Sequence, residues 1–469
     1  MQDIVSRSRE RTIGNAAGLV LLALFAFIHL HRMGALSFTW DEGSDLVTVN
    51  CLKELRNPFV CTNDISQTRL PFYIHAVAGS LAAGTTPHFL VSFFFNLLTL
   101  GAVYAYTRRE YGLRAATLFA ALYVTSPAML AAGRLVVTHS HIMVAAFSTL
   151  SFLALFESNR TGKRRWIVAC AIASGLATAC SVLAVFNGVV LLAFYQRRSW
   201  KDLVFFPIAA ATFFAASIIY VTPENFRALI DACMHGGEYP FWNYLGLGTS
   251  RAPWFFPFLL LAIKAGPWLI PAFAASRRFT ISMLIVLLLK GAVFGYETPH
   301  HQVQFYPLLY FFAAVGLARW WRRWIAVAFA ALMAVQFFDV VRFFPNYLFF
   351  GSQYGDRFIG EFYGPAVIHG QGRQQVWAAI DAILVRDPTT KFLIQDNNAL
   401  ERGGPNYVPF TQRDPQVRYE YALVDRLYAK HFNYPERDAY NRFLAEHYTD
   451  YMTTWFPPHV WAYRLLRAR

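Results

Sequence analysis

The sequence predicts a polytopic α-helical membrane protein of about 11 transmembrane helices that ends in a small extracytoplasmic α/β domain. Of the 469 residues, 56% are hydrophobic and only 15% are charged, whereas about a quarter of the residues in a soluble chain are charged. Up to residue 343, apolar runs alternate with short basic clusters, and a run of about 20 apolar residues can cross a bilayer. From residue 344 onward the chain gains charge and loses its long apolar runs.

The basic clusters predict the direction of each helix, because cytoplasmic loops carry an excess of Lys and Arg. The first apolar run, Ile13–Leu36, follows a polar segment with three arginines and has no small-residue cleavage site. We therefore expect a retained first helix and a cytoplasmic N-terminus. Leu70–Gly84 is too short and too interrupted to span, and is expected to lie at the membrane interface. The other expected spans are Phe89–Tyr106, Ala115–Ala132, Ile142–Phe156, a tight pair of short helices within Trp166–Tyr195, Leu203–Val221, Pro253–Ala274, Ile281–Phe294, Phe305–Ala318 and Ile325–Phe343.

These runs divide the chain into a membrane module, residues 1–343, and a C-terminal domain, residues 344–469. The module contains a long outer loop, residues 37–88, that includes the interfacial helix. In the C-terminal domain we expect strands at Lys391–Gln395, Val417–Tyr421 and Asp450–Thr454 and a helix at Arg437–His447. This mixture predicts a small α/β unit packed on the outer face.

The formal net charge of +14 does not indicate a nucleic-acid partner. The excess lies in short loops between apolar runs, where the positive-inside rule explains it, and the C-terminal domain is almost neutral. Membrane lipids are the expected surroundings, and the expected location is a bacterial inner (plasma) membrane with the C-terminal domain in the periplasm.

The five cysteines fall into two groups. Cys51 and Cys61 lie ten positions apart in the first outer loop, and a disulfide between them is expected if that loop faces an oxidising compartment. The spacing alone does not decide whether they pair. The others, Cys170, Cys180 and Cys233, lie in or beside apolar segments and are expected to be packing residues.

An acidic stretch, Thr39–Asp45, follows the first apolar run and contains Asp41 and Glu42. Acidic residues are costly to place near hydrocarbon, so this stretch is a candidate functional site. The alternative is that both are ordinary loop acids in contact with water. Further candidates lie on the same expected face or within apolar runs: Arg69, Tyr73, Arg134, His139, Arg251, Lys264, His300 and His301.

The candidates also have plainer interpretations. Arg134 and Arg251 could anchor helix ends at the lipid headgroups, and His139 could cap or line a packed helix. Lys264 and Lys290 lie within apolar runs, and each needs a partner or an anionic ligand unless it extends its side chain to the interface. The histidines lack a diagnostic metal-ligand spacing. No cofactor is required by the pattern, and a divalent metal stays an alternative.

Together these residue types fit one kind of reaction. A carboxylate at the membrane edge can act as general base toward an acceptor hydroxyl. Nearby cationic and hydrogen-bonding side chains can hold a phosphate and stabilise it as a leaving group. The substrate would be a lipid-linked phosphosugar, with its lipid tail between helices and its sugar under the outer loops.

The order of these elements resembles the GT-C superfamily of polyprenyl-phosphate-sugar-dependent glycosyltransferases, in particular its bacterial protein-mannosyltransferase-like and aminoarabinose-transferase-like members. The segments that carry the resemblance are Trp40–Glu42, Arg69–Tyr73, Gly133–Leu135 with Thr138–Ser140, His300–Phe305, Pro345–Leu348 and His369–Gly372. The resemblance implies that Asp41 is the catalytic base and that Glu42 supports it. The chain departs from the pattern at His139, where the family has an aspartate, and at Gln302–Gln304, where charged residues are replaced. These departures leave the donor and any metal site open.

The sequence therefore predicts an integral membrane glycosyltransferase that moves a sugar from a polyprenyl-phosphate donor to a hydroxyl acceptor on the outer face, with inversion. The acceptor could be an envelope glycolipid, a polysaccharide or a protein; the sugar and the oligomeric state are not indicated. The alternative from another class is a transporter or flippase of lipid-linked glycans. Against it, the sequence shows no matching halves and no evident pair of Gly/Pro-broken helices. A non-catalytic member of an envelope assembly is the third possibility.

Overall fold

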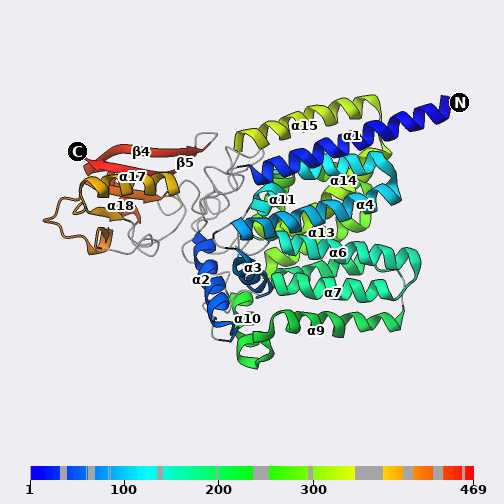
Figure 1. Ribbon diagram of the computed structural model, residues 1–469, viewed down its shortest axis with the longest axis horizontal. Coiled ribbons are helices and arrows are strands. Elements are labelled where there is room, and N and C mark those ends of the chain that lie inside the picture. Colours follow the sequence, from blue (N-terminus) through cyan, green and yellow to red (C-terminus); the bar gives the residue numbers. More distant parts are fainter. Residues whose placement is uncertain are drawn as a thin grey trace.

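The computed structural model describes residues 2–31, 40–59, 61, 69–82, 84, 86–134, 141–196, 199–235, 253–293, 299–343, 373–394, 405–425, 437–456 and 460–469. Figure 1 shows a body of long, roughly aligned helices and a smaller α/β unit beyond one end of it. Three shorter helices, α2, α3 and α10, lie at that same end, which we call the α2–α3 end (Figure 1).

Most helices of the body coincide with the apolar runs of the sequence; α2 and α10 do not. Their bounds are α1 Gln2–Leu30, α2 Trp40–Leu55, α3 Leu70–Leu81, α4 Thr86–Val124, α5 Pro127–Arg134, α6 His141–Thr161, α7 Arg165–Cys180, α8 Asn187–Phe194, α9 Phe205–Ala216, α10 Pro223–His235, α11 Phe256–Ala265, α12 Leu269–Ala275, α13 Arg277–Val293, α14 Tyr306–Arg319 and α15 Arg323–Phe343. Within the described residues four segments, Thr86–Val124, His141–Thr161, Phe256–Ala275 and Arg323–Val341, are long and apolar enough to cross a membrane, and shorter apolar helices accompany them. The chain has the build of a polytopic membrane protein, and the count of eleven spans stays a prediction.

Breaks in the long helices explain where the expected spans differ from the observed ones. The helix α4 contains two of the expected spans, Phe89–Tyr106 and the one that begins at Ala115. The chain breaks between them at Gly112, whose φ of 87° favours glycine. The span expected over Ala115–Ala132 ends at Val124, and Pro127 begins a new helix, α5. The reason is that proline disfavours the α conformation in the residue before it. The expected span Pro253–Ala274 is likewise divided by Gly266, at a φ of 57°. The expected pair of short helices within Trp166–Tyr195 is present, separated at Ser181, whose backbone is extended.

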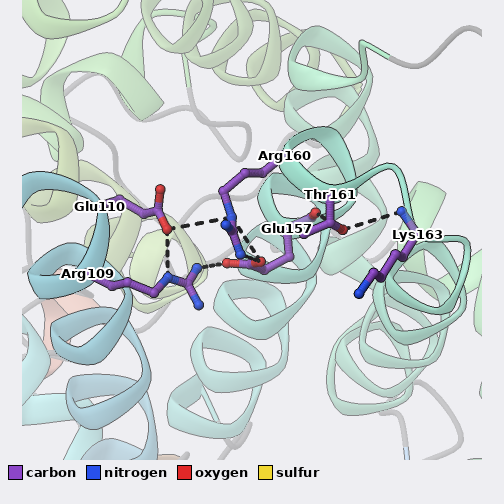
Figure 2. Close-up of polar contacts among 6 residues, drawn as sticks. All are labelled: Arg109, Glu110, Glu157, Arg160, Thr161 and Lys163. Atoms are coloured by element: carbon purple, nitrogen blue, oxygen red, sulfur yellow. Dashed lines mark hydrogen bonds and ion pairs between the residues drawn. The ribbon is translucent and has the colours of Figure 1, made fainter.

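Two helix ends are joined by ion pairs among Arg109, Glu110, Glu157 and Arg160 (Figure 2). Arg160 donates to Glu157 at 2.7 Å, and Arg109 pairs with both Glu157 and Glu110, the latter at 2.6 Å. The Glu157 side chain is only 8% exposed, whereas both arginines are half exposed. These pairs hold α6 against the end of the first half of α4 next to the Gly112 turn.

The α/β unit is a five-stranded sheet in the order β2-β1-β3-β5-β4 with the helices α17 (Arg373–Arg386) and α18 (Arg437–His447). The strand β1 is parallel to β2 and β3, and β5 is antiparallel to β3 and β4. The strands are β1 Phe392–Ile394, β2 Tyr407–Pro409, β3 Tyr421–Asp425, β4 Tyr448–Phe456 and β5 Val460–Ala468. Its position outside the membrane, and the division of the chain at residue 344, stay predictions.

The expected elements of this unit are partly correct. The helix at Arg437–His447 is confirmed, and two of the three expected strands overlap β1 and β4. The strand expected at Val417–Tyr421 is wrong except at its last residue, because Asp414 bonds the backbone N–H of Gln416 at 2.8 Å and forms a turn. The strands β2 and β5 and the helix α17 were not expected.

We expect Glu157→Gln to lower the free energy of unfolding of the helix body by about 1–2 kcal/mol, because the charge-assisted bonds of a buried carboxylate to two arginines are lost. The loss stays modest because water still solvates both half-exposed arginines. Thermal unfolding of the detergent-solubilised protein measures the change. The control is Glu110→Gln at a more exposed carboxylate of the same cluster, for which a smaller loss is expected. An equal or larger loss in the control would contradict the central role of Glu157.

Candidate active site

The acidic stretch lies in a helix. The helix α2 begins at Trp40, so Asp41 and Glu42 are in its first turn and Asp45 follows one turn later. The acids of the expected outer loop thus lie in a helix that the sequence did not predict. Carboxylates are favourable in the first turn of a helix because they face the positive end of its dipole. The structure fixes the backbone position of both acids at the α2–α3 end, and their side chains lie outside the described residues.

The second half of α2 is anchored to α3. Val49 and Leu52 of α2 pack with Phe72 and Ala76 of α3. Cys51 and Cys61, whose pairing the sequence left open, form a disulfide with their Cα atoms 5.7 Å apart. Both cysteines join the same apolar cluster. The helix that carries the acids is therefore held on α3 by packing, and the disulfide ties it to the segment between the two helices.

The helix α3 presents a buried cation and a buried hydroxyl at its first turn. Arg69 precedes the helix and is 1% exposed, with its guanidinium carbon 5.4 Å from the centre of the Phe72 ring. Tyr73 lies one turn later, and its backbone N–H bonds the Arg69 carbonyl at 3.2 Å. Pro71 suits the first turn because its missing N–H would have no partner there. The interfacial helix expected over Leu70–Gly84 is thus confirmed as a helix and ends at Leu81.

The Tyr73 hydroxyl is buried, and among the residues that the structure describes none hydrogen-bonds it. Burial raises the pKa of Tyr73, and the positive charge of Arg69 opposes that rise. The phenol therefore stays protonated and offers an O–H donor beside a guanidinium. One cation and one neutral donor together suit an anionic oxygen.

A pair of histidines, which the sequence did not predict, joins the middle of α3 to the start of α4. His75 and His88 face each other across α3 and α4 with their Nδ1 atoms 3.2 Å apart. Burial, and then the neighbouring His88, lower the pKa of His75 to about 3. The His75 ring is therefore neutral near pH 7, and a single N–H···N bond links it to His88. No local pattern marks two histidines thirteen positions apart as a pair.

Several predicted site residues have a described backbone only. Arg134 is the last residue of α5, and His300 and His301 lie in the short helix η7 (Pro299–Phe305). Their side chains, and the whole of His139 and Arg251, lie outside the described residues.

The two glutamines that replace charged residues of the family motif in η7 are buried. Gln302 donates to the carbonyl of Pro257 at 2.8 Å, and Gln304 donates to the carbonyl of Leu183 at 3.3 Å. Gln304 also accepts from the Asn187 amide at 3.4 Å. Both side chains thus tie η7 to neighbouring segments of the body.

Lys264 lies in the last turn of α11, 7% exposed. It lines a cavity of about 30 Å³ together with Asp339 of α15 and Tyr310 of α14. That volume suits one or two water molecules. A carboxylate in the same cavity accounts for a lysine inside an apolar run. Lys290, in contrast, is fully buried, so the alternative that it extends to the interface is wrong.

The cavity also corrects one sequence-based argument. Pro127 from the α4–α5 break and Gly266 and Pro267 from the α11–α12 break all line it. Two interrupted helices therefore meet at one cavity, and the statement that no such pair is evident is wrong. Among the described residues, no group of three or more His, Cys, Asp or Glu side chains could hold a metal.

The chain has the fold of two solved structures of ArnT. It is similar over 98% of both chains to ArnT from Cupriavidus metallidurans in the apo state, with a TM-score of 0.58 and 15% identity. The same enzyme bound to undecaprenyl phosphate matches with a TM-score of 0.57 and 13% identity over 96% of this chain and 97% of that chain. The arabinofuranosyltransferase AftD from Mycobacteria (mutant R1389S) gives a TM-score of 0.44 and 15% identity over 97% of this chain and 41% of that chain.

No protein-family model matches the sequence, and no curated protein matches it significantly. The resemblance to GT-C glycosyltransferases that the short motifs indicated is confirmed at the level of the fold.

We expect folding stability to fall as the pH falls from about 6.5 toward about 3, because the unfolded His75 binds a proton in that window and the folded one, with its pKa of about 3, does not. Above that window the contribution of His75 is fully present. The change in unfolding temperature between pH 7.5 and pH 5 (roughly one unit or more either side of an ordinary His pKa) should be smaller in His75→Gln than in wild type. His447→Gln, at an exposed histidine, should retain the wild-type difference; an unchanged difference in His75→Gln would contradict the prediction.

Proposed function

We propose that this protein is an integral membrane glycosyltransferase that transfers a sugar from a polyprenyl-phosphate donor to a hydroxyl acceptor on the outer face of a bacterial inner membrane. The observation that carries the proposal is the packing of α2, whose first turn contains Asp41 and Glu42, on α3, where Arg69 is buried just before the helix and the Tyr73 hydroxyl is buried in its first turn. This arrangement occurs in a fold that matches ArnT, one structure of which contains undecaprenyl phosphate.

The proposed reaction is a single displacement. Asp41 takes the proton of the acceptor hydroxyl, and the acceptor oxygen attacks the anomeric carbon of the donor. The bond between that carbon and the phosphate oxygen breaks, polyprenyl phosphate leaves with the electron pair, and the anomeric configuration inverts. Glu42 supports Asp41.

Donor binding is assigned to the cationic and hydrogen-bonding residues. The Arg69 guanidinium and the Tyr73 hydroxyl would bind the donor phosphate and stabilise the charge that grows on it as the bond breaks. The remaining candidates for donor or acceptor contacts are Arg134, His139, Arg251, Lys264, His300 and His301. In this proposal the N-terminus is cytoplasmic and the α/β unit is periplasmic.

A transporter of lipid-linked glycans is the second candidate, and one observation favours it. The meeting of two interrupted helices at a cavity with Lys264 and Asp339 is an arrangement that secondary transporters use at their substrate sites. Against it, the fold matches a glycosyltransferase along the whole chain. The cavity is also too small for a glycan, at about 30 Å³.

The proposed catalytic base, Asp41, can be tested by substitution. Wild-type protein in detergent should release free polyprenyl phosphate from at least one member of a panel of polyprenyl-phosphate sugars when an acceptor is present, and Asp41→Asn should abolish the release because the amide cannot accept the proton. Asp45→Asn, one turn further along the same helix, should retain activity. Release that survives in Asp41→Asn would place the base elsewhere, with Glu42 next. No release by the folded wild type, together with lipid movement in vesicles, would favour the transporter.

The proposed role of Arg69 in donor binding can be tested in the same assay. Arg69→Gln should raise KM for the donor and lower kcat, because the guanidinium contacts the phosphate both in the bound donor and as it leaves. Removal of one preorganised donor at a developing negative charge costs about 10²–10³-fold in kcat. Steady-state transfer with varied donor concentration measures both constants. The matched control is Arg227→Gln, at an exposed arginine of α10, which should behave as wild type. A donor KM unchanged in Arg69→Gln would contradict the assignment.

A further inference from the structure

A chain of hydrogen bonds crosses the interior of the helix body from the last turn of α1. The Nδ1 atom of His29 lies 2.9 Å from the carbonyl oxygen of Phe25. Since a carbonyl can only accept, the neutral ring carries its proton on Nδ1, and Nε2 is left as an acceptor. The Asn96 amide donates to this Nε2 at 2.8 Å, and its oxygen accepts from the Tyr123 hydroxyl at 2.5 Å. His29, Asn96 and Tyr123 are 3%, 0% and 1% exposed.

A glycine of α5 packs directly on this network. A Cβ atom at Gly133 would lie 2.1 Å from the Asn96 amide nitrogen and 2.7 Å from His29 Nε2, far inside van der Waals contact. The second N–H of the Asn96 amide is directed at the carbonyl of Met129 in α5, at 3.4 Å. The network therefore joins three elements that are distant in sequence: the end of α1, the middle of α4 and the end of α5.

The three elements lead to the candidate site. Helix α1 ends at the side of the body where α2 and α3 lie (Figure 1), and only nine residues separate Leu30 from Trp40, where the acid-bearing helix begins. Gly133 is followed immediately by Arg134. Apolar packing would allow the helices to slide and rotate, whereas directional hydrogen bonds in a low-dielectric interior favour one arrangement.

We propose that His29, Asn96, Tyr123 and Gly133 are positioning residues that set the orientation of the segment carrying Asp41 relative to the segment carrying Arg134. The inference rests on the proposed glycosyltransferase function. None of the four contacts substrate in this role; they act through the helix ends that they join. Arg69 and Tyr73 lie on α3, outside the network, so donor affinity should depend little on it, while the rate of transfer should depend on it strongly.

The test compares two amide side chains that each join separate helices of the body. Asn96→Leu removes the centre of the network, and Asn159→Leu removes an amide of α6, outside the network, that donates to the carbonyl of Phe194 at 2.8 Å. Both variants should lose thermal stability. Only Asn96→Leu should lower kcat, on the order of a hundredfold, as misplacement of catalytic groups by about 1 Å does, with donor KM near the wild-type value.

Two further variants separate positioning from the loss of a polar group. Gly133→Ala removes no hydrogen-bonding group but forces Asn96 and His29 apart, so it should lower kcat as Asn96→Leu does. His29→Gln places an acceptor near the position of Nε2 and should retain most of the wild-type kcat, whereas His29→Phe should not.

Hydrogen exchange provides a readout that does not depend on transfer. Asn96→Leu should speed amide exchange in the last turn of α1 and the first turn of α2, relative to both wild type and Asn159→Leu. A loss of kcat in Asn159→Leu equal to that in Asn96→Leu would overturn the proposal, and so would wild-type kcat in Asn96→Leu. If wild type transfers no sugar from any donor, the proposed function fails, and exchange in these two turns then decides the inference: unchanged exchange overturns it.

Discussion

The structure depends on one constraint: inside a membrane, every backbone group that a helix break exposes must find a partner in the protein. The break at Thr125 and Ser126, between α4 and α5, shows how this is met. The Ser126 hydroxyl oxygen accepts a hydrogen bond from the backbone N–H of Met129 at 3.3 Å. It also lies 2.7 Å from the Tyr310 hydroxyl oxygen, with which it shares a hydrogen bond. Gln336 of α15 donates to Thr125 at 2.8 Å and to the carbonyl of Leu122 at 3.3 Å. The break is thereby covered by side chains from two other helices.

The same constraint explains why polar groups gather in one region of the body. Trp268, next to the break at Gly266, donates to Gln336 at 2.5 Å, so the two breaks share a partner. Asn96 is tied to α5 just beyond the first break, through Met129 and Gly133. The interrupted helices therefore form a polar layer that fixes α1, α5 and α15 relative to one another. A site assembled from the ends of these helices gains its geometry from that layer and not from the apolar packing around it.

Much of the helical architecture could be predicted because hydrophobic length and basic clusters are local properties. The missed features are of two kinds. The helices α2 and α10 carry apolar residues at helical spacing, such as Val49 and Leu52 in α2, but the acidic residues and the short length favoured a loop interpretation. The pairs His29–Asn96 and His75–His88 join positions 67 and 13 residues apart. Contacts of this kind follow from tertiary packing, which a single sequence does not encode in any local pattern.

The departures from the family motif also acquire a physical meaning. Charged side chains at positions 302 and 304 would be costly at their observed depth, where Gln302 is 0% and Gln304 is 3% exposed, unless each met an opposite charge. Neutral amides instead satisfy the carbonyls of Pro257 and Leu183. With these two positions committed to tethering η7, the positive charge that the proposed reaction needs near the leaving phosphate has to come from other elements. In the proposed reaction that charge comes from Arg69, which is buried just before α3, the helix on which the acid-bearing helix packs.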